Sequence, residues 1–170
     1  MICGVHGFSR EKRDARIAAV SRQLELETVL GKKAGKLSGG WQRRLSIAMA
    51  LITQPKILFL DEPTLGLDVL ARTDLWEIIR ALKGKVTVIL TTHYMEEAAR
   101  ADRVIVINDG SVALDGTARE VFSHVDRLHS MGLESPQGVE LVRRLRDCGL
   151  DIDTDVLTAE ECESALAILL

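Results

Sequence analysis

Two adjacent carboxylates, Asp61 and Glu62, stand directly after a short apolar run and are the first candidates for chemistry in this 170-residue chain. The run, Ile57–Leu60, predicts a strand buried on both faces. One carboxylate at the end of such a strand can hold Mg²⁺, usually through water, while the other polarises an attacking water. Phosphoryl transfer needs both functions, together with donors for the phosphate oxygens. The alternative interpretation is an ordinary acidic pair at the start of a turn or helix.

Donors for an anion are predicted at Ser38, Gly39 and Gly40. A hydroxyl residue and two glycines that open a helix expose backbone N–H groups, with the positive end of the helix dipole behind them. Many helices begin in this way, so the motif alone is not specific. His93 is a further candidate because it follows a second apolar run, Val86–Leu90, and an imidazole there can reach a terminal phosphate. The alternative is an ordinary packed histidine.

The elements that must position these residues alternate between helical and strand patterns. Polar residues punctuate them: Ser38 suits an N-cap, Pro55 ends a helix, and Thr117 and Thr158 each begin a capping box. Helices are predicted over residues 10–30, 38–54, 69–82 and 96–101, strands over 57–60, 86–90 and 104–107, and a hairpin turn at 108–110 into residues 111–114. Strands alternating with helices imply βαβ units in a largely parallel sheet, whose ligands lie beyond the carboxyl ends of the strands.

The composition excludes several classes of protein. Hydrophobic residues make up 46% and charged residues 28% of the chain, which is typical of a globular domain rather than a fibrous or disordered protein. The apolar runs are short and the N-terminus becomes charged at Arg10, so neither a membrane-spanning helix nor a secretory signal is predicted. The cysteines, Cys3, Cys148 and Cys162, form no C-x-x-C pair, which argues against a disulfide framework or structural zinc site and fits a reducing cytoplasm.

The charge is unevenly distributed along the chain. Residues 1–50 hold ten Lys and Arg against four Asp and Glu, whereas residues 151–170 hold six Asp and Glu and no Lys or Arg. A basic half can contact nucleic acid or anionic lipid, and the alternative is a solvated helix face.

Four motifs that follow one another at short spacing resemble those of the nucleotide-binding subunits of ABC transporters. They are Leu37–Arg44 (LSGGWQRR), Ile57–Thr64 (ILFLDEPT), Leu65–Asp68 (LGLD) and Thr92–His93. The resemblance implies an α/β, P-loop NTPase-like ABC ATPase core, here partial because its Walker A half is missing. It also implies a helical subdomain, a short C-terminal α-helical extension, and ATP and Mg²⁺ as ligands.

The signature motif of this family contacts the γ-phosphate of ATP held by the opposite subunit. By the resemblance, Ser38, Gly39 and Gly40 match that motif, and Gln42 is assigned to nucleotide binding with them. Trp41 departs from the pattern, in which Gln is frequent, so no side-chain contact to the nucleotide is predicted there. The backbone donors of the two glycines are expected to be kept.

The remaining motif residues are assigned by the same resemblance. Asp61 matches the Walker B aspartate that serves Mg²⁺, and Glu62 matches the catalytic glutamate that acts on the water. Asp68 closes the D-loop across the dimer interface, and His93 matches the switch histidine at the γ-phosphate.

The resemblance is composite along the chain. Residues 1–98 are similar to ATPases of ABC-2-type exporters, whereas residues 102–170 resemble energy-coupling-factor ATPases of vitamin and metal-ion importers. The second likeness is carried by residues 115–122, 145–150 and 155–158. Recombination, an assembled sequence and simple divergence would each produce such a composite. The two likenesses point in opposite transport directions, so the cargo is not predicted.

No G-x-x-x-x-G-K-[ST] motif occurs in the sequence. The nearest string, Gly31–Lys36, has three rather than four residues between its glycines, is followed by Leu37, and has no strand before it. The family's Walker A, Q-loop and adenine-stacking aromatic precede the signature, so we expect an N-terminally truncated sequence. Without the loop and lysine that cradle the phosphates, the chain alone is expected to be inactive.

Three parts are predicted: a helical subdomain with the signature at residues 1–55, the C-terminal part of the ATPase core at 56–122, and a helical extension at 123–170. The extension is either a dimerisation or regulatory appendage or a packing extension with a solvated acidic face.

The predicted function is that of an ATP-binding and ATP-hydrolysing ABC transporter subunit that couples hydrolysis to membrane transport. Its expected partners are a second ABC ATPase subunit, in a homo- or heterodimer, and an integral membrane subunit at the cytoplasmic face of the cell membrane, with no nucleic acid. The alternative is a non-enzymatic or degenerate subunit that donates only its signature motif to a partner ATPase. A DNA-repair or translation ATPase with the same signature fits less well, because no coiled-coil or tandem-domain insertion is visible.

Overall fold

The computed structural model describes residues 9–153 and 155–168. The chain divides into two compact units, residues 1–91 and 92–170. The division into three parts at residues 55 and 122 stays a prediction. Cys3 lies outside the described residues, and Cys148 and Cys162 are free thiols.

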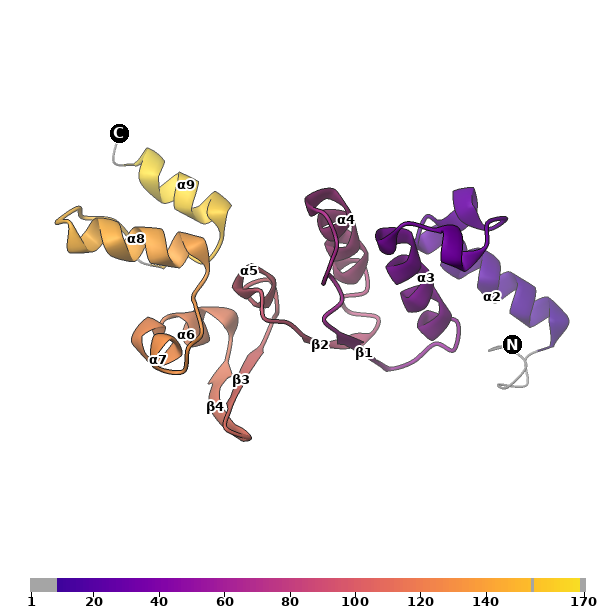
Figure 1. The fold of residues 1–170 in the computed structure, drawn as a ribbon, viewed down its shortest axis with the longest axis horizontal. Helices are drawn as coiled ribbons and strands as arrows, with labels where there is room; N and C mark the ends of the chain where they lie inside the picture. Colours follow the sequence, from indigo (N-terminus) through magenta and orange to yellow (C-terminus); the bar gives the residue numbers. More distant parts are fainter. Residues whose placement is uncertain (1–8, 154, 169–170) are drawn as a thin grey trace. The chain divides into compact units, whose positions relative to one another are not determined.

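In the first unit, helices and a pair of parallel strands pack around one apolar core. Its elements are α2 (Arg10–Gln23), η1 (Leu26–Val29), η2 (Ala34–Lys36), α3 (Gly39–Leu51), β1 (Ile57–Asp61), α4 (Val69–Arg80) and β2 (Thr87–Thr91). Strands β1 and β2 run parallel with α4 between them in the chain, which confirms the predicted βαβ unit. Figure 1 shows α3 and α4 side by side next to this pair. The core that they share includes Leu24, Leu26, Ile47, Leu75 and Leu82.

The predicted helix over residues 10–30 is wrong in its last third, after Gln23. Helix α2 ends at Gln23, and Glu25 takes a left-handed backbone conformation with φ of 57° before the short 3₁₀ segment η1. The physical reason is a tertiary contact, because the Glu25 carboxylate accepts a hydrogen bond from Arg44 of α3 at 3.0 Å. A turn at this point places Leu24 and Leu26 in the core.

The prediction that β1 is buried on both faces is also wrong. Leu58 is 4% exposed and packs in the core of the unit, whereas Phe59 is 72% exposed. Within the described residues, α3 and α4 pack with one face of the β1–β2 pair in a common core. The other face, which carries Ile57, Phe59 and Ile89, is exposed. The strand therefore alternates, as expected for burial on one face.

The second unit combines a β-hairpin with short helices. Its elements are α5 (Met95–Ala98), β3 (Val104–Asn108), β4 (Ser111–Gly116), α6 (Ala118–Phe122), α7 (Val125–Ser130), α8 (Gln137–Asp147) and α9 (Ala159–Ala167). The predicted hairpin is confirmed: β3 and β4 pair antiparallel through a turn in which Asp109 and Gly110 have positive φ angles. The largely parallel sheet is not found among the described strands, which form one parallel and one antiparallel pair, because β3 pairs with β4 across that tight turn.

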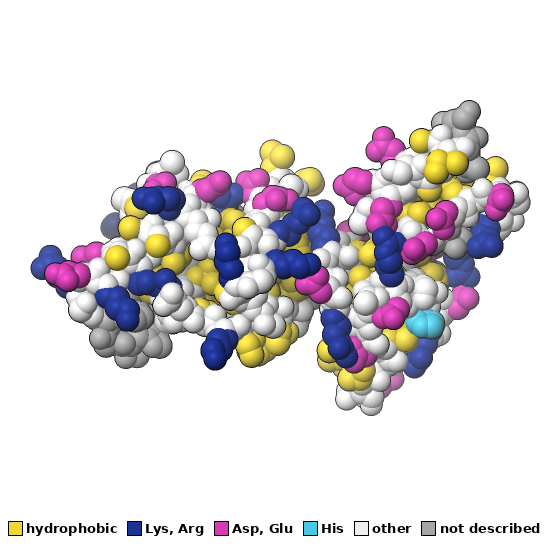
Figure 2. Space-filling view, turned by 180° about the vertical axis from the view of Figure 1, so that it is seen from behind, with side chains coloured by type: hydrophobic (Ala, Val, Ile, Leu, Met, Phe, Trp, Pro, Cys, Tyr) yellow, Lys and Arg dark blue, Asp and Glu magenta, His cyan; other side chains and the backbone are white. Residues whose placement is uncertain are grey.

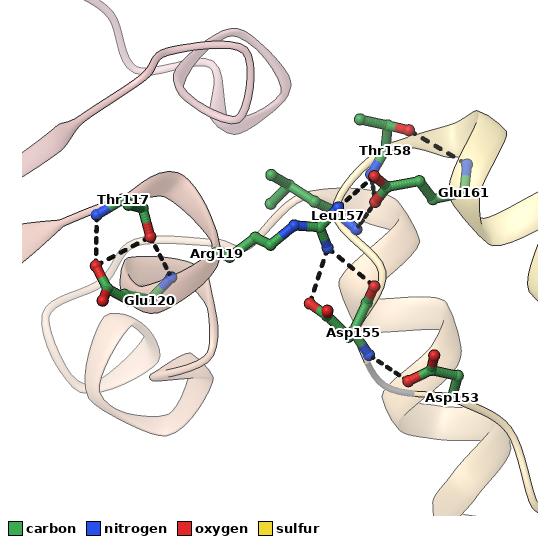
Figure 3. A network of polar contacts seen from close by, with 8 residues as sticks. All are labelled: Thr117, Arg119, Glu120, Asp153, Asp155, Leu157, Thr158 and Glu161. Atoms are coloured by element: carbon green, nitrogen blue, oxygen red, sulfur yellow. Dashed lines mark hydrogen bonds and ion pairs between the residues drawn. The ribbon is translucent and has the colours of Figure 1, made fainter.

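The C-terminal helices of the second unit are fixed by caps and ion pairs. Both predicted capping boxes are present, Thr117 with Glu120 and Thr158 with Glu161. Figure 3 shows how Arg119 of α6 connects to the second box: its guanidinium donates to Asp155 Oδ1 at 2.8 Å and pairs with Glu161. The extension thus packs against α6, while α8 and α9 bury a small core of their own around Val142, Ile152, Val156 and Cys162.

Hydrogen bonds of the capping boxes and ion pairs shift the pKa values of this region. The backbone N–H and hydroxyl of Thr117 donate to Glu120 and lower its pKa. Hydrogen bonding to Asp155 raises the pKa of Arg119. Glu140 of α8 accepts a hydrogen bond from the Ser135 hydroxyl at 2.6 Å, which lowers its pKa, and His129 Nε2 lies 2.7 Å from the same carboxylate.

On the face that Figure 2 shows, Lys and Arg side chains are scattered among acidic and uncharged ones rather than gathered in one patch. Some of them serve internal contacts: Arg16 donates to the carbonyl groups of Leu51 and Ile52 at the C-terminus of α3, and Arg44 is buried. None of the helices within the described residues has the length and apolar character that crossing a bilayer requires.

Candidate active site

The Asp61–Glu62 pair lies at the end of β1, and Thr91 at the end of β2 holds both residues. Asp61 is the last residue of the strand and stands opposite Thr91 in the parallel register. The Thr91 hydroxyl donates to Asp61 Oδ1 at 2.5 Å, and the Glu62 N–H donates to the Thr91 carbonyl at 3.2 Å. The Asp61 side chain remains exposed. Sequence reasoning missed Thr91, although its position as the polar residue that closes the second strand was a usable signal.

The backbone at Glu62 turns sharply out of the strand. Glu62 has a φ of 44°, in the left-handed region that costs a non-glycine residue on the order of 1–2 kcal/mol. Two donors hold its carbonyl oxygen: the Leu65 N–H at 3.2 Å and Nη2 of Arg43 at 3.3 Å. Pro63 and Thr64, which follow, are buried. The turn is therefore fixed by hydrogen bonds at Glu62 and by the burial of the two residues that follow it, and the Glu62 side chain is half-buried.

Asp68 ends the loop and caps the next helix. Its Oδ1 accepts a hydrogen bond from the Ala71 N–H at 2.9 Å, which satisfies one of the free amides at the start of α4. Gly66 makes the preceding turn possible with a φ of 77°. Asp68 thus has a local structural role in addition to the D-loop role predicted for it.

The signature residues open α3, as predicted, next to the start of α4. Ser38 takes the N-cap position with extended backbone, but its side chain makes no capping hydrogen bond and is exposed. A Cβ atom on Gly40 would lie 3.1 Å from the Ala71 side chain, and one on Gly39 would lie 3.5 Å from Leu67. Gly40 therefore permits a close approach of α3 to the start of α4, whereas the contact at Gly39 is an ordinary van der Waals distance.

Gln42 is turned back onto its own chain. Its side-chain Nε2 donates to the Leu37 carbonyl at 2.9 Å, just before the signature helix begins. This contact braces the loop that carries Ser38. The predicted nucleotide contact of Gln42 stays a prediction.

Arg44 is a buried anchor of the signature helix that the sequence analysis did not identify. Its side chain is 9% exposed and bridges two carboxylates, Glu25 at 3.0 Å and Asp74 of α4 at 2.7 Å. The guanidinium also lies over the ring of Trp41 at 4.9 Å from the centroid. Trp41, the residue that departs from the family pattern, therefore contributes to this anchor.

His93 belongs to the second unit. The side chain is exposed, and its ring lies 4.2 Å from the Tyr94 ring, centroid to centroid. The turn that carries it is held by Thr92, whose hydroxyl donates to Glu97 at 2.9 Å and accepts from the Tyr94 N–H at 3.1 Å. Glu97 is 3% exposed, so a buried carboxylate fixes this turn.

Comparison with known proteins connects this geometry to a family. The ABC transporter family matches residues 5–65, which include the signature helix and β1. The energy-coupling factor transporter ATP-binding protein EcfA1 of Caldanaerobacter subterraneus subsp. tengcongensis is 48% identical over 127 residues, 74% of this chain and 46% of the relative. EcfA2 of Clostridium perfringens strain 13 is 41% identical over 165 residues, 94% of this chain and 58% of the relative. This chain belongs to the ABC transporter ATP-binding family.

A solved structure supports the fold of this ABC ATPase chain. An ATP-binding cassette of an ABC transporter superposes with a TM-score of 0.62 at 26% identity, covering 68% of this chain and 48% of the other. The predicted α/β, P-loop NTPase-like class is thereby confirmed.

The chain spans about half the length of the curated relatives that it matches. Its likeness to energy-coupling-factor ATPases is not confined to residues 102–170, because the EcfA2 match covers 94% of the chain. The likeness of residues 1–98 to exporter ATPases stays a prediction.

The structure brings together several of the predicted site residues in the first unit, whereas His93 belongs to the second unit. Within the first unit, Gly39 and Gly40 lie against the loop that ends at Asp68, and α3 also reaches Glu62 through Arg43. The sequence analysis quoted Arg43 and Arg44 in the signature motif but missed their roles, which depend on tertiary contacts, and it missed Thr91, whose place at the end of the second strand was the available signal.

Proposed function

We propose that this chain forms part of an ATP-hydrolysing subunit of an energy-coupling-factor type ABC transporter, in which hydrolysis drives membrane transport. The observation that carries this proposal is the Asp61–Glu62 turn at the end of a parallel strand, hydrogen-bonded to the signature helix through Arg43. A carboxylate pair in that place supplies the magnesium ligand and the water-activating group that phosphoryl transfer uses, and the N-terminus of the signature helix supplies donors for ATP on the opposite subunit. The names of the curated relatives support the type of transporter.

Asp61 is proposed to hold Mg²⁺. The residue fits this ion, because Mg²⁺ takes one or two protein carboxylates, several waters and the substrate phosphates rather than a cage of protein ligands. Asp61 is exposed, and the Thr91 hydroxyl orients its carboxylate. When bound, the ion neutralises charge that develops on the phosphate oxygens.

Glu62 is proposed to act on the attacking water. Its backbone is held by Thr91, Leu65 and Arg43, which fixes the starting point of the side chain. A carboxylate in this position polarises a water by accepting its proton, and such general-base assistance contributes about 10²–10⁴-fold to a rate. His93 is proposed to contact the γ-phosphate from its exposed turn.

The signature residues are proposed to act on ATP that the opposite subunit holds. Ser38 and Gly39 are exposed, and they stand at the N-terminus of α3, where free N–H groups and the helix dipole favour an anion. Gln42 is proposed to support this contact by bracing the loop before the helix, and Asp68 to reach the dimer interface.

The partners follow from these roles. A second ABC ATPase subunit must supply the ATP that the signature contacts, and an integral membrane component must move the cargo at the cytoplasmic face of the membrane. Relatives named EcfA1 and EcfA2 occur together in Caldanaerobacter subterraneus, which favours a pair of different ATP-binding subunits over a homodimer.

The test is Mg²⁺-dependent phosphate release by the assembly that purifies with a tag on this chain from its native host. We expect Glu62→Gln to lower the rate by about 100-fold or more, because it removes the base but keeps the side chain's size. The control is Glu77→Gln, which alters an exposed carboxylate on α4 that pairs with Arg80. Equal rates for the wild type and the Glu62→Gln variant would refute this role.

A second candidate function is donation of the signature alone to a competent partner ATPase. The exposed Ser38 side chain, which makes no capping bond and is left available to a ligand, favours it. The two functions predict different patterns in the same assay. If this chain only donates its signature, Ser38→Arg abolishes phosphate release whereas Glu62→Gln leaves it intact.

A further inference from the structure

The signature helix α3 contacts both ends of the segment that carries the catalytic candidate. At the beginning of the segment, Arg43 Nη2 of α3 donates to the Glu62 carbonyl at 3.3 Å. At its end, Gly39 and Gly40 pack against Leu67 and the Ala71 side chain. The segment from Glu62 to Asp68 therefore rests on α3 at two points within the first unit.

The conformation of Glu62 depends on its hydrogen bonds. A left-handed φ of 44° is unfavourable for glutamate, and such a backbone persists only where its surroundings hold it. The Thr91 and Leu65 contacts come from the strand end and the turn itself. Arg43 supplies the contact from the signature helix, a hydrogen bond of 3.3 Å from a charged donor.

Arg43 and its neighbour Arg44 make different contacts. Arg44 is buried between Glu25 and Asp74 and ties α3 to the body of the unit. Adjacent helix residues point about 100° apart, and Arg43, half-buried, reaches the Glu62 turn instead.

We propose that Arg43 is a positioning residue that couples the signature helix to the main chain of Glu62. The inference rests on the proposed function, in which Ser38, Gly39 and Gly40 contact ATP on the opposite subunit. A small displacement of α3 when those residues engage the phosphate then changes the direction in which Glu62 leaves its turn. Arg43 thereby links the nucleotide site completed by the signature to the one served by Glu62.

The test compares Arg43→Met, which keeps a similar side-chain length without a donor, with Arg43→Lys, which keeps a charged donor. The control is Arg22→Met, which removes an exposed guanidinium of α2 whose carboxylate neighbour, Glu27, lies 3.8 Å away. In the purified assembly with Mg²⁺ and ATP, we expect Arg43→Met to lower kcat about tenfold, with KM within about twofold. The Hill coefficient for ATP should fall towards one, and Arg43→Lys should restore part of both.

Two outcomes overturn the inference while leaving the proposed function in place: hydrolysis that depends on Glu62 but not on Arg43, or a kcat loss matched by an equal loss of folded protein in thermal unfolding. If the wild-type assembly does not hydrolyse ATP, the proposed function fails, and amide hydrogen exchange on the 170-residue chain still tests the coupling. Arg43→Met should then speed exchange of the Leu65 N–H, which shares the Glu62 carbonyl, relative to Arg22→Met. Unchanged exchange overturns the inference.

Discussion

The buried guanidinium of Arg44 offers the sharpest test of how the signature helix is held. The Arg44 side chain is 9% exposed, whereas the side chains of its partners Glu25 and Asp74 are mostly exposed. Removing the arginine returns two carboxylates to water. Removing both carboxylates leaves a buried cation over the Trp41 ring without its counter-charges. The two perturbations delete the same ion pairs, so a difference between them measures the burial of the charge.

The magnitudes follow from that asymmetry. Arg44→Met keeps most of the apolar stem of the side chain. Solvent screening weakens the ion pairs because the two carboxylates are largely exposed. We therefore expect the free energy of unfolding to fall by about 1–3 kcal/mol. The double variant Glu25→Gln/Asp74→Asn leaves the buried Arg44 guanidinium without a counter-charge. Breaking a buried ion pair in this way lowers the free energy of unfolding by about 3–5 kcal/mol. The remaining amide groups can accept hydrogen bonds, which places the expected value at the low end of that range.

Urea unfolding followed by tryptophan fluorescence is the assay, because Trp41 and Trp76 are the two tryptophans of the chain and both lie in the first unit. Arg80→Met serves as the control, since Arg80 forms an exposed pair with Glu77 on α4 and should change stability by about 0.5 kcal/mol or less. The reasoning is refuted if Arg44→Met matches Arg80→Met. It is equally refuted if the double variant is more stable than Arg44→Met.

Two further predictions concern helix ends. Asp68→Ala should destabilise the first unit by about 1 kcal/mol through loss of the α4 cap, and Asp68→Asn should recover most of it, as urea midpoints will show. In the second unit, the hydrogen bond from the Ser135 hydroxyl lowers the pKa of Glu140 in the folded state. The ionised carboxylate therefore stabilises the fold at pH values above its ordinary pKa, and this stability is lost as the pH falls through the lower pKa of the folded state. Thermal unfolding between pH 6 and about pH 3 should therefore show a smaller acid loss for Glu140→Gln than for the wild type, and parallel curves would contradict the shift.

Local chemistry accounts for the parts of the fold that the sequence predicts well. Both capping boxes form where Thr117 and Thr158 precede a glutamate by three residues, because each box is closed by contacts within one turn. The hairpin turn at Asp109 and Gly110 is equally local. Helix α3 likewise begins after Ser38, although the Ser38 hydroxyl does not cap it.

Tertiary contacts account for the failures. The helix expected to run to residue 30 breaks at Glu25, where Arg44, nineteen residues further along, holds the carboxylate. Nothing in the local pattern of residues 10–30 indicates that partner. Phe59 was expected to be buried because an all-apolar run fits a strand covered on both faces, and that expectation depends on layers that the run itself cannot reveal. Arg43 is a further example, since its contact is with a backbone carbonyl that has no sequence signal at all.

The position of the candidate site is a consequence of the hydrophobic register of β1. Leu58 and Leu60 face the core shared with α3 and α4, and this choice fixes the pairing in which Asp61 stands opposite Thr91. A slip of one residue would turn both leucines to the exposed face and would bring either Leu60 or Glu62, rather than Asp61, opposite Thr91. The burial that stabilises the strand therefore also decides which of two chemically similar carboxylates is oriented by Thr91 and which enters the turn held by Arg43. The distinct roles proposed for Asp61 and Glu62 thus follow from core packing rather than from any difference between the two side chains.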